Sequence, residues 1–178
     1  MSSRITKRYA SAFLEFSERN AITEMTITDV KHFLEACREN KEFLVFLKSP
    51  VVKVSKKKKV LHAAFENVFC RETLNFIDLI ADNQRENLLF EIFTEFLELY
   101  KQKNGIVTAE LTTAVPVDRE LAEKIKEFVR KVSSSKSVEL VNKTDPSIIG
   151  GFKIKFHDKL LDATIVHELK EIRKRMIK

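Results

Sequence analysis

The distribution of glycine constrains this sequence more than any other feature. Glycine is absent from the first 104 of its 178 residues, and Pro50 is the only proline among them. The glycines of the chain are Gly105, Gly150 and Gly151. A long glycine-free segment rich in Leu, Phe, Glu and Lys favours helices, because glycine and proline destabilise helix interiors and form turns. The sequence predicts a helical domain over 1–105 and a differently built domain over 106–178.

Apolar residues of the first half recur at helical spacing. In the first helix Ile5, Tyr9, Ala12, Phe13 and Phe16 fall within a sector of roughly 100°. A capping-box pattern, Thr26 with Asp29 three residues later, predicts the start of the second helix. The later helices are predicted near 41–48, 56–69, 72–83 and 86–103. Wide apolar faces, two of them on the fifth helix, indicate an all-α six-helix bundle with its last helix at the centre.

The second half changes to a period of two, which is typical of strands. Strands are predicted at 106–115, around Val138 and Leu140, at 152–156 and briefly at Leu160 and Leu161, with a turn over 157–159. A helix capped by Asp118 is predicted to run to about 131, and a last helix over 164–177. In 152–156 apolar residues alternate with Lys153 and Lys155, so one face is apolar and the other basic. These elements form a small α+β domain.

No arrangement of residues indicates catalysis, a metal site or a cofactor. The histidines lie in separate elements and without ligand spacing, at His32, His62, His157 and His167. Cys37 and Cys70 stand alone and are interpreted as buried reduced thiols. Nucleotide-binding and hydrolase motifs are absent, and the many carboxylates alternate with Lys and Arg as expected for surface ion pairs. We expect a non-catalytic protein.

Charge and hydropathy leave two interpretations of the basic character open. The net charge is +6, spread over both halves, and the strongest run is Lys56 to Lys59 at the start of the fourth helix. This run either contacts RNA or anionic lipid or forms a solvated helix end, and the second interpretation is preferred because no aromatic residues are interleaved. The sequence has no apolar stretch of the roughly 20 residues that a spanning helix needs, and no secretory signal is expected.

Three segments together resemble the delta subunit of F-type ATP synthases, the bacterial relative of the mitochondrial oligomycin sensitivity conferral protein. The first reads RYASAF from Arg8 to Phe13, and the second reads NFIDLI from Asn75 with NQR from Asn83. The third reads DPSIIGGF from Asp145 to Phe152, followed by Asp158 and Asp162. The resemblance covers about residues 4 to 177 in the same order. Mild departures from the family pattern are Phe13, Thr144 and Thr164.

The resemblance implies a connector that ties the catalytic head of the synthase to its peripheral stalk. In such proteins the helical domain binds the N-terminal helix of an alpha subunit in a groove between helices one and five. The corresponding groove candidates here are Tyr9, Ala12, Phe16, Ile77 and Ala81, and the pattern is equally compatible with each of them in the core. The C-terminal part is expected to meet the b subunits of the stalk. The implied location is the cytoplasmic side of a bacterial plasma membrane, reached only through the complex.

The third segment also has a physical interpretation as a structural turn. Asp145 and Pro146 favour a turn, and Gly150 and Gly151 permit backbone angles closed to other residues. They are therefore expected to let the strand at 152–156 enter close to its neighbour, without binding a ligand. The alternative function is an RNA-binding or transcription-factor-like helical bundle, for which steeply salt-dependent RNA binding would be the discriminating observation. We expect no nucleic-acid partner.

Overall fold

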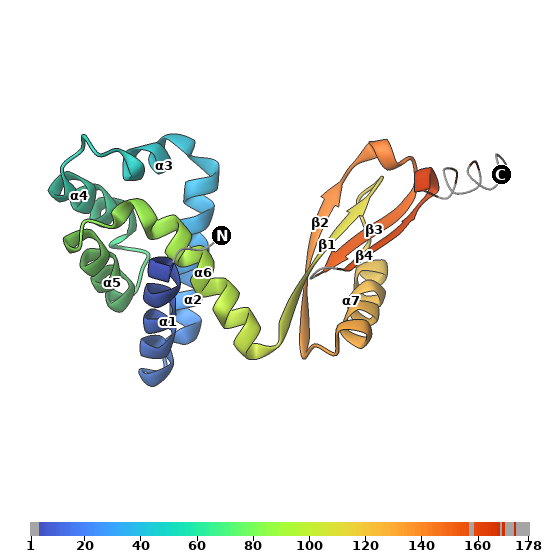
Figure 1. The fold of residues 1–178 in the computed structure, drawn as a ribbon, viewed down its shortest axis with the longest axis horizontal. Coiled ribbons are helices and arrows are strands. Elements are labelled where there is room, and N and C mark those ends of the chain that lie inside the picture. The colour runs from blue at the N-terminus through green and yellow to red at the C-terminus, as the bar shows by residue number, and fades with distance from the viewer. Residues whose placement is uncertain (1–3, 157–158, 168, 170–172, 174–178) are drawn as a thin grey trace. The chain divides into compact units, whose positions relative to one another are not determined.

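The computed structural model describes residues 4–156, 159–167, 169 and 173 (Figure 1). The chain divides into two compact units, Met1–Tyr100 and Lys101–Lys178, and each has its own hydrophobic core. The first unit is helical, and the second combines helix with a mixed sheet of the four strands described. This confirms the predicted combination of a helical N-terminal part and an α+β C-terminal part.

The helices of the first unit follow the glycine-free sequence closely. Their bounds are α1 Arg4–Arg19, α2 Thr23–Glu39, α3 Lys41–Lys48, α4 Val54–Phe65, α5 Arg71–Asp82, the 3-10 turn η1 Glu86–Leu88 and α6 Leu89–Asn104. Asn40 begins α3, because its side chain accepts a hydrogen bond from the backbone N–H of Phe43 at 3.1 Å. The third helix matches its predicted bounds, whereas α4 ends four residues earlier than predicted.

Helix α6 lies at the centre of the first core. Phe93 on α6 is fully buried, and its ring centroid lies 4.9 Å from that of Phe33 on α2 and 6.1 Å from that of Phe76 on α5. The same ring lies 6.3 Å from that of Phe13 on α1. Such aromatic pairs add roughly 0.5–1.5 kcal/mol each beyond the burial of their area. The prediction that the last helix of the bundle is central is confirmed.

The predicted capping box at Thr26 and Asp29 is wrong. Helix α2 begins three residues before Thr26, whose hydroxyl donates to the carbonyl of Ile22 at 3.0 Å. Asp29 is buried, and its Oδ2 accepts a hydrogen bond from the backbone N–H of Cys70 at 2.9 Å. Cys70 is the N-cap residue of α5, so the carboxylate of Asp29 satisfies a free N–H at the positive end of a different helix.

The prediction that the lysine run forms a solvated helix end is wrong for Lys57. Its side chain is 2% exposed, and its Nζ donates to Glu86 Oε1 at 2.8 Å and to the carbonyl oxygen of Leu47 at 2.7 Å. These contacts join α4 to η1 and to the last turn of α3. The interpretation of the carboxylates as surface groups is likewise wrong for Glu86 and Asp29, since both are buried. Lys56 and Lys59 are exposed as predicted.

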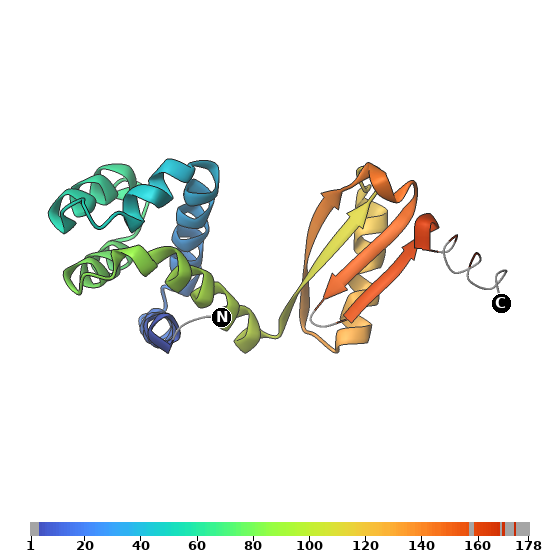
Figure 2. The ribbon, with the colours of Figure 1, turned by 45° about the horizontal axis from the view of Figure 1, so that its top comes forward.

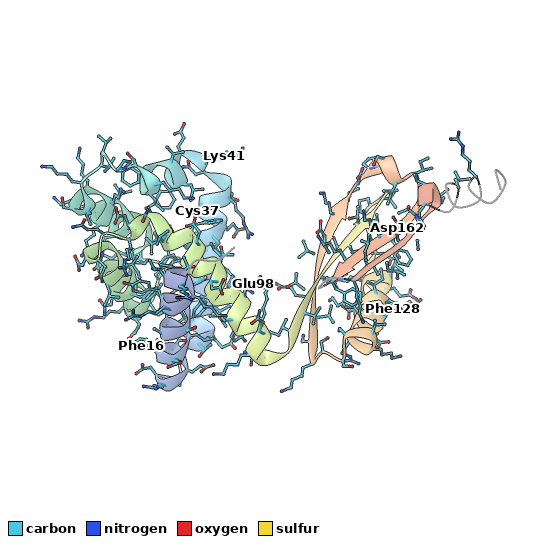
Figure 3. All side chains as sticks on the ribbon, viewed as in Figure 1. Phe16, Cys37, Lys41, Glu98, Phe128 and Asp162 are labelled. Atoms are coloured by element: carbon cyan, nitrogen blue, oxygen red, sulfur yellow. The ribbon has the colours of Figure 1, made fainter. Side chains whose placement is uncertain are left out.

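Cys37 lies on α2 (Figure 3). Its thiol is buried in the first core, with the residue 2% exposed, whereas Cys70 is only half-buried. Burial, with a smaller contribution from the charge of Glu91, raises the pKa of Cys37 to about 11. The folded state therefore keeps this proton to higher pH than the unfolded state. The corresponding contribution to the free energy of unfolding is complete below pH 9 and is lost as the pH rises through about 11.

In a Cys70→Ser variant, alkylation of Cys37 by iodoacetamide is expected to increase with a midpoint near pH 11, the pKa of the buried thiol. At pH 9 the rate should be about 50-fold lower than in the urea-unfolded chain, because only the thiolate reacts. Mass spectrometry of the modified protein measures this rate. A midpoint in the ordinary range for cysteine, with circular dichroism showing a folded protein, would contradict the burial of this thiol.

The second unit contains a sheet with strand order β2-β1-β3-β4. Its elements are β1 Ile106–Thr113, α7 Arg119–Ser133, β2 Ser137–Thr144, the 3-10 turn η2 Pro146–Ile148, β3 Gly151–Phe156 and β4 Lys159–Thr164. Strands β1 and β2 are parallel, and α7 connects them, whereas β1–β3 and β3–β4 are antiparallel. Helix α7 starts as predicted, because Asp118 Oδ1 accepts from the backbone N–H of Leu121 at 2.8 Å.

Helix α7 covers one face of this sheet, as Figure 2 shows. Ile125 and Val129 of α7 are buried together with Leu111 of β1 and Ile154 and Phe156 of β3. The lysines of β3 point away from this core, and Lys155 is paired in register with Glu110 of β1. The predicted alternation of an apolar and a basic face along β3 is confirmed.

The end of the chain is described only in part. The predicted turn at 157–159 lies largely outside the described residues, and so does most of the last helix predicted over 164–177. Thr164 ends β4, residues 165–167 are helical, and Thr164 Oγ1 accepts from the backbone N–H of His167 at 3.2 Å. Strand β4 is longer than the brief strand predicted at Leu160 and Leu161.

Candidate partner-binding groove

An apolar groove runs between α1 and α5 in the first unit. Its volume is about 430 Å³. The residues that line it are Arg8, Tyr9, Ala12, Phe13 and Phe16 from α1 and Glu72, Asn75, Phe76 and Leu79 from α5. Phe16 is 45% exposed on α1 (Figure 3), and Leu79 on α5 is 50% exposed. Two large apolar side chains that flank an open groove are typical of a surface that binds a partner.

Stacked aromatic rings form the floor of the groove. The rings of Phe13 and Phe76 lie 3.9 Å apart at an interplanar angle of 6°. Phe13 is 2% exposed, and its ring lies 5.3 Å from that of Phe96 on the central helix. The floor is therefore continuous with the core of the bundle, so binding to it requires little reordering of side chains.

A hydrogen bond closes one end of the groove. Arg85, in the turn after α5, donates from Nη1 to the hydroxyl of Tyr9 at 2.7 Å. The guanidinium carbon also lies 5.4 Å from the centre of the Tyr9 ring, within the range of a cation–π contact. The preceding residue, Gln84, has a φ of 55°, which turns the chain tightly after α5. These contacts hold Tyr9 of α1 against the end of α5.

The structure brings together three of the five residues predicted for the groove. Tyr9, Ala12 and Phe16 line it, but Ile77 and Ala81 do not, because they are 1% and 0% exposed and face the core. The residues of α5 that line the groove instead are Glu72, Asn75, Phe76 and Leu79, together with Arg8 and Phe13 on α1. The selection of Ile77 and Ala81 as surface residues is therefore corrected. Whether Tyr9, Ala12 and Phe16 contact a partner stays a prediction.

One signal in the sequence points to the correct face of α5. Residues 72, 75, 76 and 79 follow the helical spacing of i, i+3, i+4 and i+7, so they share one face. This face carries Glu72 and Asn75 beside two apolar residues, whereas the row of Leu74, Ile77 and Ala81 is wholly apolar. A wholly apolar row belongs in a core, and the mixed row is the one that can border solvent.

The predicted structural turn lies in the second unit, between β2 and β3. Asp145 Oδ1 accepts from the backbone N–H of Ser147 at 3.0 Å, and the hydrogen bonds from Ser147 lower the pKa of Asp145. Pro146 begins η2. A Cβ on Gly150 would lie 2.7 Å from Cδ1 of Ile165, and one on Gly151 would overlap the backbone of Ala163. The contact with backbone atoms explains Gly151 by packing, whereas the neighbour of Gly150 is the end of an exposed side chain that can move.

The described residues offer no group of three or more His, Cys, Asp or Glu side chains arranged to hold a metal ion. Among the described histidines, the Nε2 of His62 on α4 lies 3.0 Å from Oδ2 of Asp78 on α5. Within the part of the chain that the structure describes, none of the helices has the length and apolar character needed to cross a membrane.

Comparisons with known proteins agree with the resemblance seen in the motifs. The family model of the ATP synthase delta (OSCP) subunit matches residues 5–176. ATP synthase subunit delta of Prochlorococcus marinus strain AS9601 is 33% identical over 168 residues, which cover 94% of this chain and 93% of the relative. The Cytophaga hutchinsonii protein of the same name is 28% identical over 170 residues, covering 96% of this chain and 92% of its own.

A solved structure shares the fold at low identity. A chain from the cryo-EM structure of the Toxoplasma gondii mitochondrial ATP synthase hexamer matches with a TM-score of 0.74 and 20% identity, and 99% of each chain is covered. At this identity the likeness concerns the fold alone. The match of the family model over nearly the whole sequence, supported by the relatives, assigns the family: the chain belongs to the ATP synthase delta (OSCP) subunits.

Proposed function

We propose that this chain is a non-catalytic connector of an F-type ATP synthase, which holds the catalytic head to the peripheral stalk. In this proposal the first unit binds the N-terminal helix of an alpha subunit in the groove between α1 and α5. The single observation that supports this role is the groove itself, an apolar channel of about 430 Å³ with exposed Phe16 and Leu79 at its edges. An amphipathic helix is a usual occupant of an apolar groove between two helices.

The second unit is proposed to contact the b subunits of the stalk. Support for this part comes from the family and from exposed apolar side chains along α7. Leu121, Phe128 and Val132 are 42%, 44% and 42% exposed, and their spacing of seven and four residues places them on one face of the helix. We propose the cytoplasmic side of a bacterial plasma membrane as the location, with membrane association only through the complex.

The alternative of an RNA-binding bundle gains no support from the comparisons. The lysine run that motivated it also offers less charge than its sequence suggests. Lys57 is buried in an ion pair, and Lys58 lies 2.6 Å from Asp82. Electrostatic binding to phosphates needs several free cations on one face.

A Leu79→Glu substitution is expected to weaken binding of a synthetic N-terminal peptide of the cognate alpha subunit by at least about tenfold. The reason is that Leu79 would lose apolar area against the peptide and bury a charge instead. Val45→Glu is a matched control, because Val45 is 69% exposed on α3 and does not line the groove. Titration calorimetry with the full chain measures both affinities. Equal affinities, or no binding to the folded wild-type chain, would contradict the proposed role of the groove.

A further inference from the structure

The helices that form the groove run in opposite directions. Phe13 of α1 stacks on Phe76 of α5. Tyr9 precedes Phe13 in the chain, and its hydroxyl accepts a hydrogen bond from Arg85, which follows Phe76. Moving toward the start of α1 therefore means moving toward the end of α5. Arg8 must then lie at the Leu79 end of the groove, and Glu72 must lie at the Phe16 end.

Opposite charges consequently stand at opposite ends of the groove. Arg8 lies five residues before Phe13, and Glu72 lies four residues before Phe76. At about 1.5 Å per residue, the two side chains are attached about 13 Å apart along the groove, or between two and three turns of a bound helix. Among the described residues neither Arg8 nor Glu72 has an ion pair, so both charges are available to a partner.

The surface between these two charges is mostly apolar, with Asn75 as a polar residue on its α5 side. Phe13, Phe76 and Ala12 lie along it, and the hydroxyl of Tyr9 is already engaged by Arg85. An occupant that covers this surface removes water from beside Arg8 and Glu72, which strengthens their interaction with charges on the occupant. An apolar surface alone accepts an amphipathic helix in either direction. The charges distinguish the two directions.

Relying on the proposed function of the groove, we propose that Arg8 and Glu72 fix the direction in which the partner helix binds. The fitting partner is an amphipathic helix with an acidic side chain at the Arg8 end and a basic side chain two to three turns away, at the Glu72 end. A helix with acidic residues in its first turn and basic residues in its last has the commonly favoured distribution of charge. Such a helix lies parallel to α1 and antiparallel to α5.

Charge-reversal variants of the full chain test the two contacts. With the cognate alpha N-terminal peptide at low ionic strength, Arg8→Glu and Glu72→Lys are each expected to weaken binding about three- to tenfold, because an attraction becomes a repulsion. Lys7→Glu and Glu66→Lys make the same charge changes at exposed positions that do not line the groove, and they should change the affinity less than twofold. The difference between variants and controls should shrink in high salt.

A spin label on the peptide tests its direction. A nitroxide at the acidic end of the peptide should broaden the amide signals of Arg8 and Leu79, and one at the basic end should broaden those of Phe16 and Glu72. The reversed pattern, or groove variants that match their controls while the wild-type chain binds the peptide, overturns this proposal and leaves the proposed function standing. A folded wild-type chain that does not bind the peptide contradicts the proposed function and this proposal with it.

Discussion

Replacing Lys57 by alanine is expected to lower the free energy of unfolding of the first unit by about 3–5 kcal/mol, because the variant leaves Glu86 charged and buried without its cation. The Nζ of Lys57 lies 2.8 Å from Glu86 Oε1, and Oε2 of Glu86 is buried with no hydrogen-bond partner among the described residues. The variant also removes the hydrogen bond to the carbonyl of Leu47 at the end of α3. The variant therefore removes the side chain that joins α4 to both α3 and η1.

Tyrosine fluorescence during urea unfolding measures this effect in the full chain. Both tyrosines, Tyr9 and Tyr100, belong to the first unit and the chain has no tryptophan, so the signal follows the unfolding of that unit. Lys59→Ala is the matched control, because Lys59 is exposed and carries the same charge two residues after Lys57. This variant should change the free energy of unfolding by less than about 0.5 kcal/mol. A double variant, Lys57→Met with Glu86→Leu, should recover most of the loss, since replacing a buried ion pair by apolar residues is often neutral. Equal effects of Lys57→Ala and Lys59→Ala would show that the ion pair does not stabilise the fold.

The helices were predictable because their signals are local, whereas the ion pair was not. Four consecutive lysines look alike in a short window, but the buried residues of α4 are Lys57, Leu61 and Phe65, at a spacing of four. That spacing places Lys57 on the apolar face of its helix, so the sequence contains the signal that Lys57 is buried. Its partner, Glu86, is 29 residues away, and no local pattern connects the two. Only the packing of α4 against η1 brings them together.

The predicted position of the groove, between α1 and α5, agrees with the structure, but not all of its predicted residues line it. The reason is again that tertiary packing decides which face of a helix is buried. The pairing of α1 with α5 came from the family resemblance, and the α1 residues followed from the apolar stripe of that helix. Helix α5 has two apolar faces, and Ile77 lies on the one that faces the core. A single helix does not show which of its faces its neighbours cover, so its sequence is compatible with Ile77 in the groove or in the core. The buried role of Asp29 at the start of α5 likewise depends on tertiary packing, and a capping box within α2 was the local alternative.

A Gly151→Ala substitution is expected to lower the free energy of unfolding of the second unit by about 2–5 kcal/mol. Gly151 has a φ of 77°, which costs an L-residue roughly 1–2 kcal/mol, and overpacking against a neighbouring strand costs roughly 1–3 kcal/mol more. The added Cβ would overlap the carbonyl oxygen of Ala163 and lie 3.0 Å from Cα of Thr164, both in β4. Because these are backbone atoms of a paired strand, they cannot move aside without separating β3 from β4.

A Gly105→Ala variant separates the conformational cost of a positive φ from the cost of overpacking. Gly105 has a similar φ of 64°, but a Cβ there would meet only the side chain of Lys136, at 3.4 Å, and this flexible chain can move. It should therefore show the conformational cost alone, about 1–2 kcal/mol. Hydrogen exchange of peptides from β1 and β3 in the full chain measures the stability of the sheet in both variants. A larger loss for Gly151→Ala supports the interpretation that packing against β4 requires glycine at position 151. If the two variants lose equally, the contact with β4 does not require glycine at position 151, and the packing explanation of that glycine fails.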